Sequence, residues 1–282
     1  MGGVCRIVPL PQGEESQSFA FQHGESDYVV RVNKNADGFK KDLFAYENFT
    51  KPELPIPEII HIGPLEEYAI CISRRACGVT LQDLDAAALP QMAGPTARVL
   101  NEISGSNVDR ITGFGVFDSS GIGREKSWRS FLVSIGDPGR YDWALASRSV
   151  DMRLVHRLIE LVNRFAEHCP EERKLVHGDF GSNNVLANAG KITAVIDWSE
   201  ALVGDPLYDV ANIFFWRPWL RCMELQARYF ESLVADEARW RERMLCYQLR
   251  IGLDEIYDNA VQGRAGNVDW ALSRCLQIAD GG

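Results

Sequence analysis

One polar stretch, set between short apolar segments, limits what this chain can fold into more than any other feature. His177 lies two residues before Asp179, and Asn184 follows five residues after Asp179. Asp197 comes 13 residues beyond Asn184, directly after the apolar run 192–196. Phosphoryl transfer needs such a set, with one carboxylate to orient the attacking hydroxyl and further oxygen groups to hold Mg²⁺ on the phosphates. The spacing therefore predicts phosphoryl-transfer chemistry.

The apolar segments 174–176 and 192–196 predict two strands, which we expect to pair as a hairpin. Such a hairpin brings the loop after its first strand beside the residue that ends its second strand, so the polar residues converge. Any one of them alone would fit a polar turn that satisfies its own backbone groups. The complete spacing between two strands favours a catalytic site.

The tripeptide Asp179-Phe180-Gly181 also spells the metal-binding motif of protein kinases. His177 before it and Asn184 after it place Asp179 in the catalytic loop instead. The metal-binding carboxylate is then expected downstream, at Asp197.

The first hundred residues are rich in short β-prone segments. Residues 18–22 and 28–33 predict a hairpin, and residues 58–62 and 68–73 predict two further strands. Between them, apolar side chains at spacings of three and four predict a helix over residues 37–49.

The rest of the chain has a helical pattern, with helices expected over residues 81–103, 150–169 and much of 208–279. We expect two lobes, residues 1–77 and residues 78–282. A small β-rich lobe followed by a larger, mostly helical lobe is an α+β plan.

Composition excludes several classes of protein. The chain has 282 residues, of which 46% are hydrophobic and 24% charged, as in ordinary globular proteins. No apolar run approaches the roughly 20 residues that span a bilayer, and the start lacks an apolar signal core, so we expect a cytoplasmic protein without a membrane partner. The seven cysteines form no CxxC pair, which argues against a disulfide framework or a zinc site. The net charge of −9 argues against a nucleic-acid partner and fits a cationic small substrate.

The motifs together resemble those of the aminoglycoside phosphotransferase family. The resemblance rests on His177-Gly178-Asp179 with Asn184, on 196–198 and on 204–206. Further stretches are similar to the hygromycin B phosphotransferases of that family: 13–16, 31–33, 36–39, 54–58, 71–75, 78–84, 179–186, 192–201 and 211–220. The resemblance implies a two-lobed protein-kinase-like fold and ATP-dependent phosphorylation of an aminoglycoside hydroxyl, with hygromycin B as the expected substrate and antibiotic resistance as the result.

The resemblance also implies roles for individual residues. Asp179 would be the catalytic base or the residue that orients the hydroxyl, and Asn184 and Asp197 would hold Mg²⁺. Residues 1–77 would bind the nucleotide, and residues 78–282 would carry the catalytic and substrate sites.

The nucleotide would be held by several groups of the first lobe. A turn over 14–18, with Ser16 and Ser18, would cover the phosphates. Arg31 would bind the phosphates, and its acidic partner on the following helix is either Asp42 or Glu47, with Asp42 preferred by helix register. Adenine would dock against the segment from Ser73 through Arg75 to Cys77. ATP is the expected co-substrate, and GTP stays open.

Carboxylates would bind the ammonium groups of the substrate. The candidates are Glu200, Asp254, Glu255 and Asp258, although an exposed acidic helix face explains the last three equally well. Asp209 is expected either to cap a helix that begins near Val210 or to hold the loop, and Asp205 to hydrogen-bond the backbone of the catalytic loop. The aromatic group Trp216, Trp219 and Tyr229 is expected to form core and cleft wall.

Two other functions stay open at this point, and we expect a monomer in each case. One is a kinase of the same fold that acts on another small hydroxyl metabolite or antibiotic. The other is a catalytically silent nucleotide-binding protein.

Overall fold

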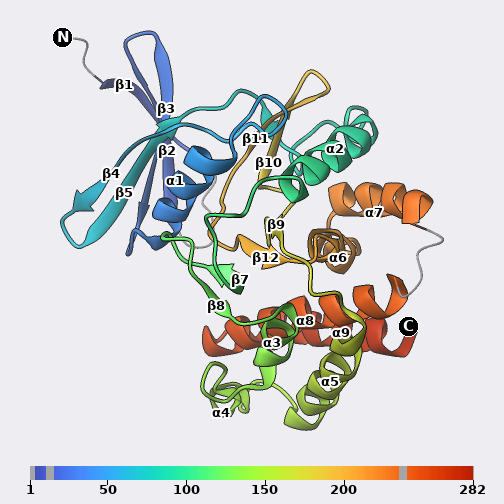
Figure 1. Ribbon diagram of the computed structural model, residues 1–282. Coiled ribbons are helices and arrows are strands. Elements are labelled where there is room, and N and C mark those ends of the chain that lie inside the picture. Colours follow the sequence, from blue (N-terminus) through green and yellow to red (C-terminus); the bar gives the residue numbers. More distant parts are fainter. Residues whose placement is uncertain (1–3, 11–15, 235–239, 282) are drawn as a thin grey trace.

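The computed structural model describes residues 4–10, 16–234 and 240–281. A five-stranded antiparallel sheet forms one end of the molecule, with helix α1 (Asp37–Phe49) packed against it (Figure 1). The strand order is β1-β2-β3-β5-β4. The strands are β1 (Val4–Pro9), β2 (Gln17–His23), β3 (Ser26–Asn33), β4 (Ile59–Leu65) and β5 (Tyr68–Arg74). The sequence pattern did not predict β1, which pairs with β2 ahead of the expected first strand.

Helix α1 has the predicted bounds, and its buried face is unusual. The apolar residues Phe39, Ala45 and Phe49 are buried, as an amphipathic pattern requires. Lys41 and Asp42 are buried with them. Each of these two buried charges needs a polar partner, and the partners lie in the functional site.

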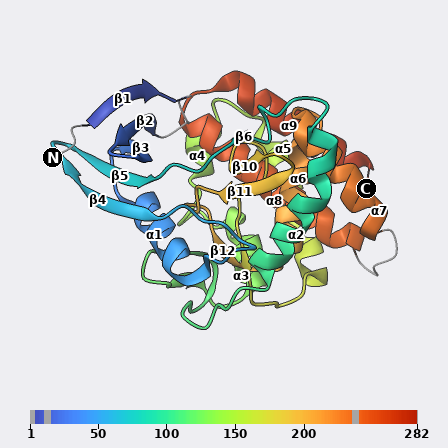
Figure 2. The same cartoon turned by 90° about the horizontal axis from the view of Figure 1, so that it is seen from above.

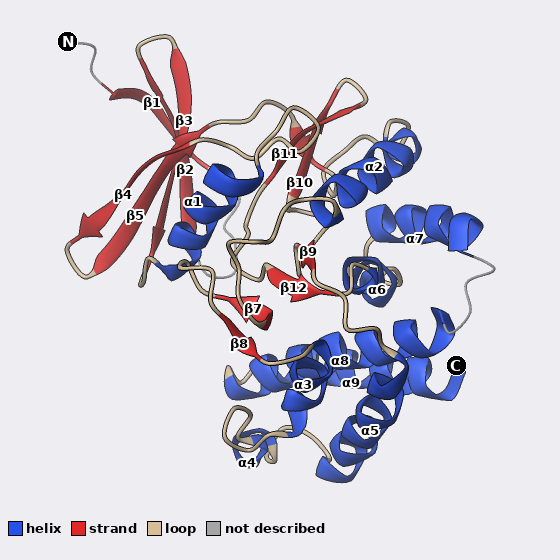
Figure 3. Cartoon of the chain, viewed as in Figure 1, coloured by secondary structure: helices blue, strands red, loops and turns tan. Residues whose placement is uncertain are grey.

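The remainder of the chain is mostly helical, with two small sheets in the order β11-β10-β6 and β8-β7-β12-β9 (Figure 3). The α-helices are α2 (Ala93–Ser104), α3 (Trp128–Val133), α4 (Trp143–Ala146), α5 (Met152–Phe165), α6 (Leu207–Trp216), α7 (Arg221–Val234), α8 (Trp240–Val261) and α9 (Ala265–Gly281). The strands are β6 (Val79–Thr80), β7 (Phe114–Phe117), β8 (Gly123–Glu125), β9 (Lys174–Val176), β10 (Val185–Asn188), β11 (Lys191–Val195) and β12 (Leu202–Gly204). Short 3₁₀ turns cover Leu89–Met92, Ser134–Gly136 and Ala166–His168.

The helix expected over 81–103 is shorter than predicted, because α2 begins only at Ala93. Polar side chains take the backbone groups before it. Asp85 accepts a hydrogen bond from the amide of Ala87 at 2.8 Å, and the hydroxyl of Thr80 binds the carboxylate of Asp83 at 2.8 Å. Such local side-chain bonds compete with helix formation.

The hairpin predicted between 174–176 and 192–196 is wrong. Strand β11 pairs with β10, and β9 pairs with β12 instead. The two residues that join β10 to β11, Ala189 and Gly190, have φ of 47° and 77°. Two positive φ values in succession are typical of the tight turn that joins adjacent antiparallel strands.

The main hydrophobic core extends across both parts of the molecule. It includes Phe49, Leu54 and Ile56 together with Trp198, whose ring centroid lies 6.1 Å from that of Phe49. The view from above again has the β1–β5 sheet at the end opposite α7 (Figure 2). Within the described ranges, no helix has the length and apolar character to cross a membrane.

Candidate active site

The loop between β9 and β10 is folded tightly by two glycines. Gly178 and Gly181 have φ of +87° and +116°, values that residues other than glycine rarely adopt. A Cβ on Gly178 would lie 2.3 Å from the carbonyl oxygen of Glu200, and one on Gly181 would lie 2.8 Å from the sulfur of Met223. The loop is therefore pressed against its neighbours on both sides.

Asp179 lies at the exposed tip of this loop, and Asn184 holds it. The buried Asn184 donates from Nδ2 to the carbonyl oxygen of Asp179 at 2.9 Å and to its carboxylate Oδ2 at 2.7 Å. The amide oxygen of Asn184 takes no part in either bond. An exposed carboxylate fixed in this way can accept a proton from a bound hydroxyl.

Asp197 lies two residues after the end of β11 and is exposed, with a φ of +60°. The backbone amide of Ile196, its neighbour, donates to the carbonyl of Asn184 at 2.9 Å. The structure thus brings Asp179, Asn184 and Asp197 to one place, although the strand pairing that does so differs from the expected one.

Asn184 and Asp197 are the residues that could hold a metal ion. They supply one amide oxygen and one carboxylate, a set suited to Mg²⁺, which retains waters and phosphates as its other ligands. Among the described residues, no cluster of three His, Cys, Asp or Glu side chains could hold an ion alone. The donor set fits an ion bound together with a nucleotide.

The buried side chains of Asp209 and His177 hold the start of the loop in place. The carboxylate of Asp209, on α6, accepts from the backbone amides of His177 and Gly178, both at 2.9 Å. Burial raises the pKa of Asp209 to about 7, against the effect of these two amides. The ring of His177 lies 3.1 Å, through Nε2, from the carbonyl of Ile196, and burial lowers its pKa to about 4. His177 is therefore neutral at pH 7.

Among the described residues no hydrogen bond joins Asp205 to the catalytic loop, so the expected support of the loop by Asp205 is wrong. Its fully buried carboxylate accepts from Arg243 at 2.9 and 3.0 Å and from the hydroxyl of Tyr247, both on α8. Because Asp209 already reaches the loop amides from α6, Asp205 instead joins the end of β12 to α8.

Arg31 on β3 forms an ion pair with Asp42 on α1. Asp42 uses its other oxygen, Oδ1, to accept the backbone amide of Trp198 at 2.8 Å. The alternative partner, Glu47, is exposed. Asp42 therefore links the strand that carries Arg31 to the residue that follows Asp197.

The other predicted nucleotide residues lie along the same sheet and its exit. Ser18 is opposite Arg31 in the β2–β3 ladder, and Ser16 is half-buried just before β2. Glu14 and Glu15 lie outside the described residues.

The segment after β5 holds the three residues expected near adenine. Ser73 is buried at the end of β5, whereas the side chains of Arg75 and Cys77 are exposed. The carbonyl of Cys77 accepts a hydrogen bond from the hydroxyl of Thr193 at 2.6 Å. The amide of Arg75 donates to the carbonyl of Asp27 at 3.0 Å.

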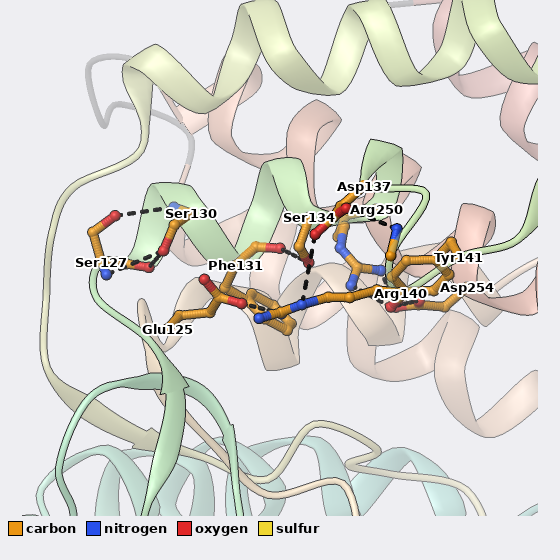
Figure 4. Close-up of polar contacts among 11 residues, drawn as sticks. Glu125, Ser127, Ser130, Phe131, Ser134, Asp137, Arg140, Tyr141, Arg250 and Asp254 are labelled. Atoms are coloured by element: carbon orange, nitrogen blue, oxygen red, sulfur yellow. Dashed lines mark hydrogen bonds and ion pairs between the residues drawn. The ribbon is translucent and has the colours of Figure 1, made fainter.

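Of the four predicted substrate carboxylates, two are close enough to interact electrostatically, Glu200 and Asp254. The protein around Glu200 raises the pKa of its carboxyl, although the side chain reaches solvent, and Asp254 is among the carboxylates that add to the shift. Asp254 accepts from the Tyr141 hydroxyl at 2.7 Å and pairs with the buried Arg250 (Figure 4). Asp254 is therefore oriented by its neighbours.

The remaining two carboxylates also belong to α8. Glu255 accepts from Asn259 at 3.3 Å within α8 and lies on the side of Cys275 of α9. The exposed Asp258 borders a cavity of about 470 Å³ that Tyr141 and Arg250 also line.

Lys41 belongs to this site, although the sequence motifs did not predict it. Its ammonium donates to the carbonyls of Ser199 and Ala201, the latter at 2.9 Å, and lies 4.7 Å from the centroid of the Phe117 ring. Burial lowers its pKa to about 8, against the pull of nearby carboxylates, first of all Glu200. Helical register was the available signal, since positions 41, 45 and 49 share one buried face.

Trp216 and Trp219 form one ring cluster, and Tyr229 has no ring contact with it among the described residues. The two indoles contact each other and Trp270, with centroids 4.5 to 5.7 Å apart, and Trp219 is 53% exposed. Tyr229 packs on Phe230 instead.

A hydrogen-bonded link joins this indole group to the loop. Trp216 Nε1 donates to the side chain of Asn212 at 3.1 Å, and Asn212 donates to the carbonyl of Phe180 at 3.3 Å. Phe180 directly follows Asp179.

A family model, described as the phosphotransferase enzyme family, matches residues 6–244. The chain belongs to this family. Hygromycin-B 4-O-kinase of Escherichia coli is a phosphotransferase relative with 47% identity over 280 residues, which are 99% of this chain and 82% of the relative.

Solved structures confirm the two-lobed protein-kinase-like α+β fold of this phosphotransferase. A thermostable mutant of aminoglycoside phosphotransferase APH(4)-Ia, in a ternary complex with AMP-PNP and hygromycin B, has 48% identity and a TM-score of 0.93. The match covers 98% of this chain and 94% of that one. A further APH(4)-Ia structure has 46% identity and a TM-score of 0.94, over 99% of this chain and 95% of that one.

Proposed function

We propose that this protein transfers the γ-phosphoryl group of ATP to a hydroxyl of hygromycin B and so inactivates the antibiotic. The observation that carries the proposal is the 47% identity, across 99% of the chain, to a relative named for that reaction. The grouping of Asp179, Asn184 and Asp197 supports it, because the residues that the reaction needs are present and close together.

Asp179 acts on the acceptor hydroxyl. It takes the proton while the hydroxyl oxygen attacks the γ-phosphorus, and the bond from that phosphorus to the β–γ bridging oxygen breaks to release ADP. Asn184 holds the Asp179 carboxylate in the required orientation through the 2.7 Å bond.

Asn184 and Asp197 would hold Mg²⁺, which supplies positive charge to the nucleotide phosphates. Arg31, kept in place by Asp42, adds a cation from the first lobe. Ser16 and Ser18 face the phosphates in this proposal, and adenine docks against 73–77 through backbone groups. Residues 1–77 thus bind the nucleotide, and residues 78–282 bind the acceptor.

The ammonium groups of the acceptor are bound by Glu200 and Asp254 in the first place. Asp258 extends this acidic region at the nearby cavity, and Glu255 adds long-range negative charge only. A single chain carries both sites, so we expect an active monomer in the cytoplasm, where ATP is available.

Release of ADP by purified protein, with ATP and Mg²⁺, tests the proposal. Hygromycin B should stimulate release strongly, whereas kanamycin, streptomycin and choline should not. Stimulation by another compound alone would keep the reaction and replace the substrate. Nucleotide binding without turnover on any of them would contradict the proposal.

The variant Asp179→Asn keeps the shape of the side chain and removes the base. We expect it to fold normally and to lose roughly 10²- to 10⁴-fold in kcat, the usual contribution of general-base catalysis. Asp269→Asn, an exposed position on α9, is the matched control and should keep full activity. Activity of the Asp179 variant near that of the control would exclude the assigned role.

A further inference from the structure

Two neighbouring charged residues of α1 hold the segment that follows Asp197. Lys41 donates to the carbonyls of Ser199 and Ala201, and Asp42 accepts the amide of Trp198 at 2.8 Å. We refer to residues 198–201 as the clamped segment. The segment has local hydrogen bonds, such as that from the Ala201 amide to the carbonyl of Trp198 at 3.0 Å, and the helix that packs on the first sheet adds these further bonds.

A buried ammonium group lowers the stability of the fold unless its N–H groups have hydrogen-bond acceptors. Lys41 is only 6% exposed, and its partners are two carbonyls and the face of the Phe117 ring. The charged groups that surround it belong to several elements, namely Asp42 of α1, Asp118 after β7, and Asp197 and Glu200 around the clamped segment. The placement of Lys41 is therefore determined by these groups together.

The clamped segment lies against the catalytic loop. The two carbonyls that Lys41 binds lie on either side of Glu200. The carbonyl of Glu200 is so close to Gly178 that a Cβ there would lie 2.3 Å from it. Gly178 precedes Asp179, so any shift of the segment changes the space in which the catalytic loop sits.

We propose that Lys41 is a positioning residue of phosphoryl transfer. Its ammonium fixes the clamped segment, so that Glu200 and Asp179 face the same acceptor molecule. The identity of that acceptor rests on the proposed function, but the effect of Lys41 on the loop does not.

Asp42 and Lys41 contact different parts of the site. Asp42 also pairs with Arg31, so its loss disturbs the proposed nucleotide site. The hydrogen bonds of Lys41 go to the clamped segment, beside the acceptor carboxylate. Loss of the Lys41 ammonium is therefore expected to lower kcat and to raise the KM for the acceptor. The affinity for the nucleotide should stay unchanged.

The test compares Lys41→Met, which keeps the aliphatic stem and removes the ammonium, with Lys40→Met on the same helix. Lys40 is 53% exposed, and in the part of the chain that the structure describes its ion-pair partner is the exposed Asp37, so its variant should behave as wild type. For Lys41→Met we expect kcat/KM for hygromycin B to fall between about 10-fold and 100-fold, because small misplacements of reacting groups have effects of that size. Lys41→Arg, which keeps the charge and the donors, should recover part of this loss.

Three readouts separate this proposal from others. AMP-PNP affinity measured by calorimetry should be equal in Lys41→Met and Lys40→Met; an equal loss of nucleotide and acceptor affinity would overturn the proposal. An unchanged kcat/KM would also overturn it. If Lys41→Met does not fold, the Arg variant decides: a wild-type melting temperature with a reduced kcat/KM supports the positioning role, and a return of both to the wild-type values assigns Lys41 to stability alone.

Hydrolysis of ATP by water, in the same variants, keeps the two proposals distinct. Should the wild type not phosphorylate hygromycin B, the proposed function fails. A lower rate of acceptor-free hydrolysis in Lys41→Met than in Lys40→Met would still support the positioning role, and equal rates would contradict it.

Discussion

His177 opens the catalytic motif, yet its contacts are those of a support. Its ring packs between Phe180 and Trp198, with centroids 5.9 and 4.7 Å away, and its Nε2 faces the carbonyl of Ile196. In the described part of the chain, its Nδ1 has no hydrogen-bond partner. A neutral imidazole that donates from Nε2 suits these surroundings, because a second proton would find no acceptor.

This environment predicts a dependence of stability on pH. The pKa of His177 is about 4 in the folded protein and 6.5 ordinarily, so the unfolded chain takes up the proton first as the pH falls. The stability that His177 contributes is complete above pH 6.5 and is lost between pH 6.5 and 4. Between pH 7 and pH 5 the loss is about 2 kcal/mol.

Urea unfolding at the two pH values measures this loss. His177→Gln keeps a donor toward Ile196 and should show a smaller change between pH 7 and pH 5. The control, His156→Gln at an exposed position of α5, should retain the full change. If all three proteins lose equal stability, other groups are responsible.

At the scale of elements, the loop between β9 and β10 and the turn between β10 and β11 offer a comparison of two glycines. Gly178 and Gly190 have similar positive φ, at +87° and +77°. A Cβ on Gly178 would overlap the backbone of Glu200, whereas a Cβ on Gly190 would meet nothing within 4 Å. The two positions thus separate backbone strain from close packing.

We expect Gly190→Ala to lower the free energy of unfolding by about 1–2 kcal/mol, the cost of a side chain in the left-handed region, with activity retained. Gly178→Ala should have the same cost and in addition displace the catalytic loop, so turnover should fall sharply. Denaturant titration and the ADP-release assay provide the two measurements. Equal turnover in both variants would show that the loop tolerates the displacement.

Local patterns in the sequence predicted these elements where the signal lies within a few residues. The bounds of α1 follow from its apolar spacing, and Asp179, Asn184 and Asp197 follow from one motif. Strand β10 was missed because its apolar residues lie inside the same motif, directly after Asn184. The roles of Lys41 and the pairing of Asp205 depend on segments more than 30 residues away, which spacing alone does not bring together.

At the scale of the whole molecule, a buried cluster of charged side chains joins the end of strand β12 to helix α8. Asp205 at the end of β12 binds Arg243 and Tyr247 of α8 and also accepts the amide of Leu207 at 3.0 Å. Asp205 is fully buried, and Arg243 is 17% exposed at its side chain. Removal of the carboxylate would leave a largely buried guanidinium without this partner.

We expect Asp205→Ala to lower the free energy of unfolding by about 3–5 kcal/mol, as for other buried ion pairs broken on one side. For a chain of this length, that corresponds to a decrease in Tm of roughly 10 °C. Asp280→Ala breaks the exposed pair of Asp280 with Arg157 and should change stability by less than about 1 kcal/mol. Thermal melts of both variants test the contrast, and equal shifts would refute it.

The hold of α1 on the clamped segment has a consequence for how relatives can diverge. Lys41 binds the carbonyls of Ser199 and Ala201, and a carbonyl is the same group whatever side chain its residue carries. Mutation at positions 199 and 201 therefore leaves the contact available. The selective constraint falls on the helix, where both the length and the charge of residue 41 must persist through evolutionary drift.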